Sequence, residues 1–88
     1  MKFELGKTVI TANAKQKLDE VSVSEILLER YIKGDWGNLC ESDKQLNEDA
    51  LKNGDRIFAS YVDSNGTKFW IITESDRSYT TVLLPEDY

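Results

Sequence analysis

Three β-rich runs in the second half of the chain constrain the fold more than any other feature of the sequence. They cover residues 56–63, 67–74 and 79–84. The short stretches between them are rich in Ser, Asn, Asp and Gly, the residues that favour turns. Short β-rich runs separated by such turns are typical of hairpins. We therefore predict a three-stranded antiparallel meander.

The first hairpin sets the register of the meander. If Asn65-Gly66 is a two-residue type I′ turn, Tyr61 lies across from Trp70. One face then carries Phe58, Val62, Phe69, Ile71, Val82 and Leu84, and the other carries Ile57, Ala59, Tyr61, Trp70, Ile72 and Leu83. Because neither face is polar, both need cover. Either helices cover both faces, or helices cover one and a second subunit or target protein closes the side of Tyr61 and Trp70.

The first half of the chain supplies the helices. Three segments combine helical spacing of apolar residues with a polar residue suited to cap the first turn. They are residues 13–20 with Asn13 as N-cap, residues 22–33 with a Ser22/Glu25 capping box and Gly34 at the end, and residues 42–52 with a Ser42/Gln45 capping box and Gly54 at the end. Leu46, Ala50 and Leu51 are the expected inward residues of the third helix.

A partly alternating stretch, residues 3–11, predicts a first strand with a bend or bulge at Gly6. With 88 residues, the chain has room for one core and one domain, 1–88. The predicted class is α+β, with two or three helices packed on a short antiparallel sheet of three or four strands, in the order β-α-α-α-β-β-β. Whether the first strand pairs at the edge of the meander or inside it stays open.

Charge and cysteine content indicate which binding partners and which cellular compartment to expect. The formal charge is −5, from 11 basic and 16 acidic residues, and the basic residues are spread along the chain. Such a surface works against binding to nucleic-acid phosphates. Cys40 is the only cysteine, so no internal disulfide forms, and no apolar stretch has the length of a signal peptide or membrane span. We therefore expect a cytoplasmic protein that does not bind membranes.

The chain has no histidine, which removes the commonest general base and the usual zinc ligand. Cys40 is read as a small packing residue, and no phosphate loop, calcium loop or other metal motif appears, so we predict no catalytic residue, no cofactor and no metal. One enzymatic alternative is a magnesium-dependent nuclease built on Asp55, Glu74 and Asp76, with Lys68 nearby. Acids at strand ends are, however, commonly turn formers.

Four segments resemble a family of small bacterial proteins. They are Gly34-Asp35-Trp36-Gly37-Asn38-Leu39, Leu51-Lys52-Asn53-Gly54-Asp55-Arg56-Ile57, Trp70-Ile71-Ile72-Thr73-Glu74-Ser75-Asp76-Arg77-Ser78 and the ending Thr80-Thr81-Val82-Leu83-Leu84-Pro85-Glu86-Asp87-Tyr88. Proteins of that family are called plasmid-related or hypothetical and are associated with plasmids, integrated elements and phages. The resemblance implies a gene neighbourhood, and it carries over no catalytic residues.

These observations favour a non-enzymatic protein-binding accessory protein of a bacterial mobile element or phage. An inhibitor of a host defence or nucleic-acid-processing protein is one form of this hypothesis, and a homodimer is another use of the same surface. The candidate binding residues are Asp35, Trp36, Tyr61, Trp70, Asp76 and Arg77. For Trp36 a place in the core is favoured over binding, and for Asp76 and Arg77 an ordinary role in the turn is favoured over binding. The alternatives are the nuclease and a small nucleic-acid-binding regulator.

Overall fold

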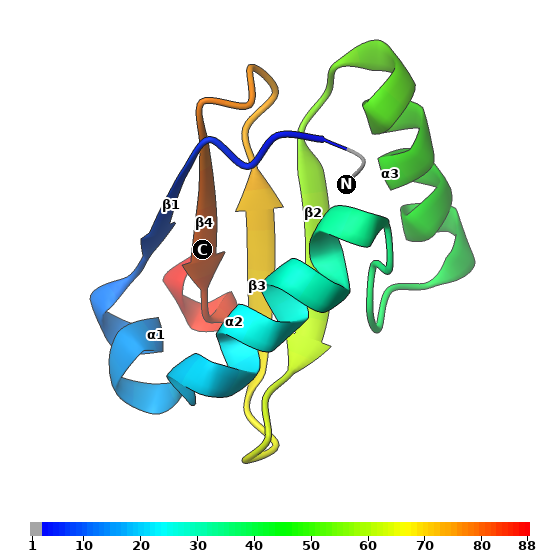
Figure 1. Ribbon diagram of the computed structural model, residues 1–88. Coiled ribbons are helices and arrows are strands. Elements are labelled where there is room, and N and C mark those ends of the chain that lie inside the picture. Colours follow the sequence, from blue (N-terminus) through cyan, green and yellow to red (C-terminus); the bar gives the residue numbers. More distant parts are fainter. Residues whose placement is uncertain (1–2) are drawn as a thin grey trace.

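A computed structural model describes residues 3–88 and shows an α+β fold with elements in the predicted order (Figure 1). The elements are β1 (Lys7–Ile10), α1 (Ala12–Lys17), α2 (Glu20–Glu29), the 3-10 turn η1 (Tyr31–Lys33), α3 (Glu41–Asn53), β2 (Ile57–Val62), β3 (Lys68–Thr73), β4 (Tyr79–Leu83) and the 3-10 turn η2 (Pro85–Asp87).

The sheet has the strand order β1-β4-β3-β2. Strands β2, β3 and β4 form the predicted antiparallel meander, and β1 joins its far edge parallel to β4. The first strand therefore lies at an edge, which answers the question that the sequence left open. It is also shorter than predicted, because the chain turns at Gly6 and only Lys7–Ile10 pairs with β4.

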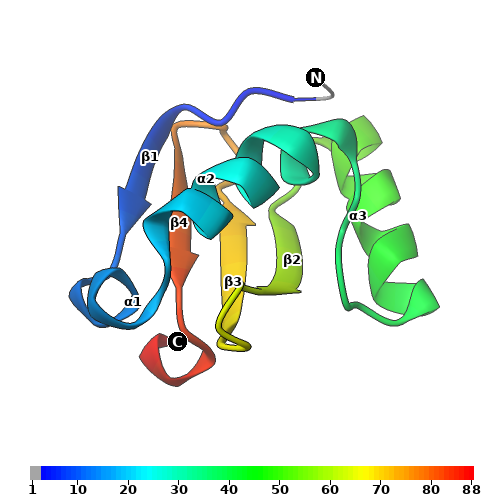
Figure 2. The same cartoon turned by 60° about the horizontal axis from the view of Figure 1, so that its bottom comes forward.

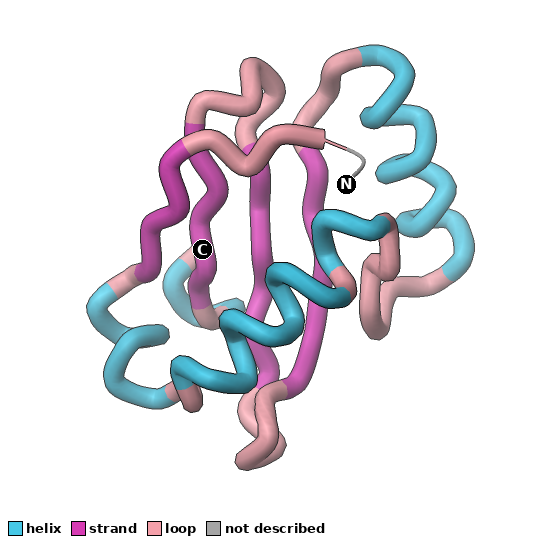
Figure 3. Tube along the Cα trace, viewed as in Figure 1, coloured by secondary structure: helices cyan, strands magenta, loops and turns pink. Residues whose placement is uncertain are grey.

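The helices lie on one side of the sheet and at one edge of it. Helix α2 crosses one face, α1 lies at the end of β1, α3 lies beside the β2 edge, and η2 lies on the face opposite α2 (Figures 1 and 2). In the view of Figure 3, α2 crosses diagonally in front of β3 and β2. The core fills the space between helices and sheet and contains Ala14, Leu18, Val23, Tyr31, Trp36, Ala50, Ile57, Ala59, Tyr61, Phe69, Ile71, Val82 and Leu84.

The predicted register of the first hairpin is wrong by one residue. Tyr61 pairs with Phe69, and Ser60 lies across from Trp70. The loop has three residues, because the Asp63 N–H bonds the Thr67 carbonyl at 3.0 Å. A slip of one residue moves a whole strand to the other face.

The residues of β3 and β4 were assigned to the faces consistently with each other, but each residue of β2 lies on the face opposite to the one predicted. The face under the helices carries Ile57, Ala59, Tyr61, Phe69, Ile71 and Val82, all of them buried. Helix α2 crosses one face of the sheet, and no α-helix crosses the other face in the described residues 3–88. The alternative in which helices cover both faces is therefore wrong.

Two helices begin earlier than the sequence analysis predicted. Thr11, not Asn13, caps α1, its Oγ1 accepting from the Ala14 N–H at 3.1 Å. Asp19 caps α2 by accepting from the Ser22 N–H at 3.0 Å, so Ser22 lies inside the first turn. Asp and Ser are about equally favourable as N-caps, and Asn is more favourable than Thr, so residue preference alone does not select Thr11 or Asp19.

The third helix also begins at a different residue. The N-cap of α3 is Cys40, whose side chain makes no capping bond, and the helix starts at Glu41 rather than through a Ser42 box. The predicted end of the third helix is confirmed, because Gly54 follows α3 in the left-handed conformation. The second helix ends earlier than predicted, at Glu29, and the left-handed Gly34 instead ends the 3-10 turn η1.

Helix α3 packs through polar contacts with the edge of β2. The Asn47 amide accepts from the Phe58 N–H at 3.1 Å and donates to the Phe58 carbonyl at 2.6 Å. Further along, the Asn38 N–H bonds the Ser60 carbonyl at 2.8 Å. Leu46 was expected to point inward but is 64% exposed, because the side of α3 that contacts the domain carries Asn47 and Ala50. The outer edge of β2 is thus occupied.

Asp63 joins the hairpin tip to the start of α2. One carboxylate oxygen accepts from the Asp19 N–H at 3.0 Å, and the other accepts from Asn65 at 3.0 Å and Thr67 at 2.8 Å. Burial raises the pKa of Asp63, but these backbone donors outweigh burial and hold the pKa below its usual value of 3.8.

The depressed pKa predicts how stability depends on pH. A lowered pKa in the folded state adds stability above the unfolded value, and that contribution disappears as the pH falls through the folded value. We expect Asp63→Asn to lose about 1–2 kcal/mol at pH 7. Its free energy of unfolding should also fall less than that of the wild type between pH 6 and 3, measured by urea denaturation. Equal slopes for the two proteins would contradict the assignment.

Candidate functional site

The face of the sheet opposite α1 and α2 is the candidate site, and we call it the open face. Alternate residues of β2, β3 and β4 point toward it. They are Phe58, Ser60, Val62, Lys68, Trp70, Ile72, Tyr79, Thr81 and Leu83. Val62 and Tyr79 are 40% and 43% exposed, whereas Ile72 and Leu83 are nearly buried beneath their larger neighbours. The open face is therefore apolar in the middle and accessible at its margins.

A hollow of about 250 Å³ lies on the open face, lined by Arg56, Phe58, Trp70, Ile72 and Tyr88. The rings of Phe58 and Trp70 meet edge to face, with centroids 5.0 Å apart at 88°. Trp70 and Tyr88 repeat this arrangement at 5.8 Å and 70°. These rings border the recess, which we call the aromatic hollow.

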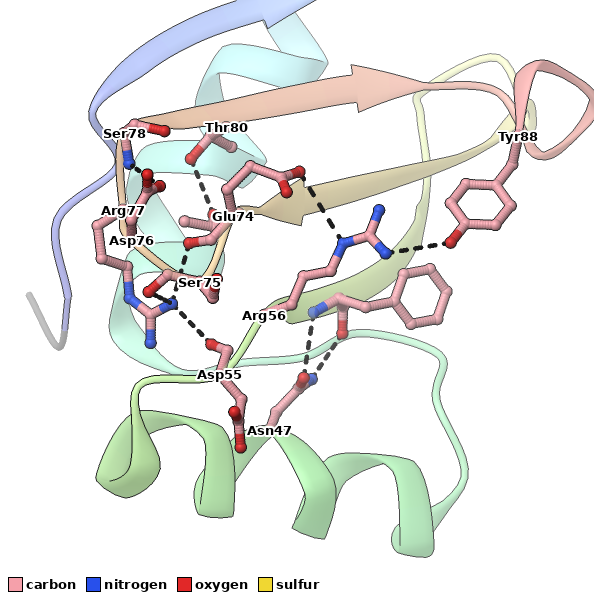
Figure 4. Close-up of polar contacts among 12 residues, drawn as sticks. Asn47, Asp55, Arg56, Glu74, Ser75, Asp76, Arg77, Ser78, Thr80 and Tyr88 are labelled. Atoms are coloured by element: carbon pink, nitrogen blue, oxygen red, sulfur yellow. Dashed lines mark hydrogen bonds and ion pairs between the residues drawn. The ribbon is translucent and has the colours of Figure 1, made fainter.

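Arg56 forms the polar rim of the aromatic hollow. Its Nη1 donates to the Tyr88 hydroxyl at 3.2 Å, and its guanidinium lies 5.6 Å from the centre of the Tyr88 ring. Its Nε is 3.9 Å from a Glu74 carboxylate oxygen (Figure 4). The guanidinium thus links the residue before β2 to Glu74, which follows β3, and to Tyr88 at one side of the hollow.

Tyr88 is carried to the hollow by the turn η2, which is tied to α1. The Asp87 carboxylate accepts from the Thr11 hydroxyl at 2.7 Å and from the Asn13 amide at 3.0 Å. Lys17 and Glu86 add an exposed ion pair at 3.3 Å. The hydrogen bond from Thr11 holds the pKa of Asp87 below its usual value. These contacts fix the direction in which the chain leaves β4.

Two of the predicted binding residues, Trp36 and Tyr61, belong to the core. Trp36 is 3% exposed and its indole N–H donates to Glu48 at 2.7 Å. Tyr61 is fully buried and its hydroxyl donates to the Asp35 carbonyl. Burial raises the pKa of Tyr61. Trp70 points to the other face, so the sheet separates it from Trp36 and Tyr61.

Asp35 organises the loop that contains Trp36. Its carboxylate accepts from Arg30 Nε at 2.8 Å and from the Gly37 N–H at 3.1 Å. The Arg30 guanidinium is the main reason that the pKa of Asp35 lies below its usual value. The same guanidinium lies 5.0 Å from the centre of the Tyr61 ring. The contacts of Asp35 are therefore those of a loop residue beside the core.

Asp76 and Arg77 lie in the connection between β3 and β4 (Figure 4). Asp76 accepts from the Ser78 N–H at 2.9 Å, and the bonds from Ser78 hold its pKa below the usual value. Arg77 has a φ of 61°, and its guanidinium donates to four carbonyl oxygens. The acceptors are Ala50, Asp55, Glu74 and Ser75. Both side chains are engaged in holding the turn.

The acids proposed for a nuclease do not converge. Glu74 points toward Arg56, and Asp76 toward the backbone of Ser78 (Figure 4). Within residues 3–88, no three acidic or cysteine side chains are grouped so that they could hold a metal ion. The arrangement therefore gives magnesium chemistry no support.

Of the predicted binding residues, Trp70 alone lines the aromatic hollow. The other lining residues, Arg56, Phe58, Ile72 and Tyr88, were not predicted from the sequence. The correct hairpin register would have placed Phe58 beside Trp70 on one face. No local signal predicts Tyr88, because its position depends on the contacts between η2 and α1.

Comparison with protein-family models, curated proteins and solved structures gives no match, so the function is argued from the site. No helix in the described part of the chain, residues 3–88, has the length and apolar character needed to cross a membrane.

Proposed function

We propose that the protein is a non-enzymatic binding protein whose open face docks on another protein. The observation that supports this most is the aromatic hollow, in which Phe58, Trp70 and Tyr88 surround an apolar floor and Arg56 lies at the rim. Tryptophan, tyrosine and arginine are the residue types enriched among the strongest contributors to protein interfaces. An apolar side chain of the partner would fill the hollow.

The dimensions of the hollow favour a protein over a free small molecule. Pockets for drug-sized ligands usually measure about 300–1,000 Å³. The hollow measures about 250 Å³ and lies on a wider apolar face that includes Val62, Tyr79 and Leu83. A recess on a broad face is the arrangement of an anchor site within an interface.

The setting that we propose is a bacterial mobile element or phage, on the basis of the resemblance in the loop, turn and terminal segments. The net charge of −5 supports a partner with a basic surface. An inhibitor that occupies a basic cleft of a host defence or nucleic-acid-processing protein fits both features.

We predict that Trp70→Ala weakens partner binding at least 30-fold, because loss of a central anchor costs about 2 kcal/mol or more. Tagged wild-type protein and the variant would be used for affinity capture from bacterial lysate, followed by calorimetry with the purified partner. Tyr79→Ala is the matched control, since Tyr79 lies on the open face but outside the hollow. Equal binding by the wild type and Trp70→Ala, or no captured partner, would refute the proposal.

The nucleic-acid alternative rests on the same residues, because exposed rings beside an arginine also stack with unpaired bases. The charge of −5 opposes it. Mobility-shift assays with single-stranded DNA and RNA at low salt would decide between the two, and a shift that weakens with salt and with Trp70→Ala would support nucleic-acid binding. Adding magnesium to the same reactions tests the nuclease alternative. That alternative requires that the wild type cleave the nucleic acid and that Glu74→Ala not cleave it.

A further inference from the structure

The two edges of the sheet differ in whether their outward backbone groups are already bonded. The outer edge of β2 is occupied by the Asn47 side chain and by the Asn38 N–H. Strand β1 is the other terminal strand, and within residues 3–88 no strand lies beyond it. One edge of the sheet is therefore closed by other parts of the chain, and the other edge is available.

The backbone of β1 presents hydrogen-bonding groups on its outer side. The N–H groups of Lys7 and Thr11 bond the carbonyls of Ser78 and Val82, so they point toward β4. Because backbone groups of successive strand residues point to opposite sides, those of Thr8 and Ile10 point away from β4. These are the donors and acceptors that an added strand uses.

An apolar groove runs beside this edge, and we call it the β1 groove. It has a volume of about 200 Å³ and lies between β1 and α2. Its lining includes Ile10, Leu18, Val23, Leu27 and Val82. Leu18, Val23 and Val82 are buried at its floor, whereas Ile10 is 36% exposed. A strand edge beside a helix-lined apolar groove is the geometry of peptide recognition by strand addition.

The charges next to the edge restrict what an added strand can carry. Glu20 is the charged residue that lines the β1 groove, and Lys7 is exposed at the start of β1. Within residues 3–88 neither forms an ion pair. Since strand side chains alternate between faces, the matching segment carries apolar residues and one basic residue on the groove side. An acidic residue on its other side would meet Lys7.

We propose that β1 accepts an extended segment of a partner protein as a fifth strand. Its apolar side chains enter the β1 groove, and a lysine or arginine meets Glu20. This site is separate from the aromatic hollow, because the groove lies on the helix side of the sheet and the hollow on the open face. The two proposals therefore succeed or fail independently.

The test is selection of a phage-displayed library of random dodecapeptides on the immobilised full chain. We expect enriched peptides to alternate β-branched or other apolar residues with polar ones and to carry one basic residue on the apolar side. A synthetic peptide from the selection should bind Thr8→Pro at least tenfold more weakly, since proline removes an outward N–H. Trp70→Ala should bind the peptide as the wild type does.

Reversing the charges of Glu20 and of the basic residue of the peptide distinguishes a lost contact from a misfolded variant. Glu20→Lys should weaken the selected peptide at least tenfold, and a peptide in which the basic residue is replaced by glutamate should recover binding to Glu20→Lys. Failure to enrich any peptide would overturn the proposal, as would equal binding to the wild type, Thr8→Pro and Glu20→Lys. Self-association that light scattering detects and Thr8→Pro abolishes, without peptide enrichment, would assign the edge to a second copy instead.

Discussion

Gly37→Ala should lose more than about 3 kcal/mol of folding free energy, the largest effect that we expect from one added methyl group. Gly37 has a φ of 74°, a conformation that costs an alanine about 1–2 kcal/mol by itself. Its Cβ would also overlap the Ser60 carbonyl oxygen and lie 2.8 Å from the Tyr61 ring. Neither neighbour is free to move, because Ser60 is in β2 and Tyr61 is fully buried.

Gly54 and Gly66 provide matched controls for this prediction. Both have positive φ, but an added Cβ at either position meets no atom within 4 Å. Gly54→Ala and Gly66→Ala should therefore lose only the conformational cost of about 1–2 kcal/mol. Guanidinium denaturation followed by circular dichroism measures all three differences. A loss at Gly37 no larger than at Gly54 would show that the loop does not approach β2 as closely as described.

Arg77→Ala should lose about 2–3 kcal/mol, the second-largest effect, because it removes a charged donor from several carbonyl groups at once. The bonds to Asp55 at 2.7 Å and Ala50 at 3.3 Å join the end of α3 to the β3–β4 turn. The bonds to Glu74 and Ser75, at 3.1 and 3.2 Å, hold the turn itself. Without the guanidinium, these hydrogen bonds between the end of α3 and the turn are lost.

The left-handed backbone at Arg77 allows the side-chain effect to be separated from the backbone effect. Its φ of 61° is strained for alanine and relaxed for glycine. Arg77→Gly should therefore be about 1 kcal/mol more stable than Arg77→Ala while remaining less stable than the wild type. Urea denaturation of the three proteins gives the order. If Arg77→Ala were as stable as the wild type, the guanidinium contacts would contribute nothing to the fold.

The sequence predicted the elements well where local chemistry decides them. The β-rich runs predicted the meander, and Gly54 ends α3 as predicted, whereas α2 ends before Gly34. The starts of α1 and α2 were predicted too late, because Asn13 and Ser22 are themselves favourable N-cap residues and stand just after Thr11 and Asp19. The choice between them depends on where the chain leaves the preceding element.

The candidate site was harder to predict, because it depends on register and on distant contacts. Asp63 accepts bonds from the hairpin and from the Asp19 N–H, which favours a three-residue loop over the Asn65-Gly66 turn. The one-residue difference between the two loops decides whether Tyr61 or Phe58 shares a face with Trp70. The prediction for α3 was correct for Ala50 and Leu51 and wrong for Leu46, because α3 lies at the edge of the sheet and turns Asn47 rather than Leu46 toward β2.

The closed edge of β2 also bears on how copies of this protein can assemble. A sheet with two available edges can extend without limit, since each added copy offers a new edge to the next. Here Asn47 and Asn38 occupy one edge, so pairing through strands must end after the first addition to β1. One available edge permits a finite complex and disfavours a fibril. The backbone and side-chain bonds of Asn38 and Asn47 help to close the other edge.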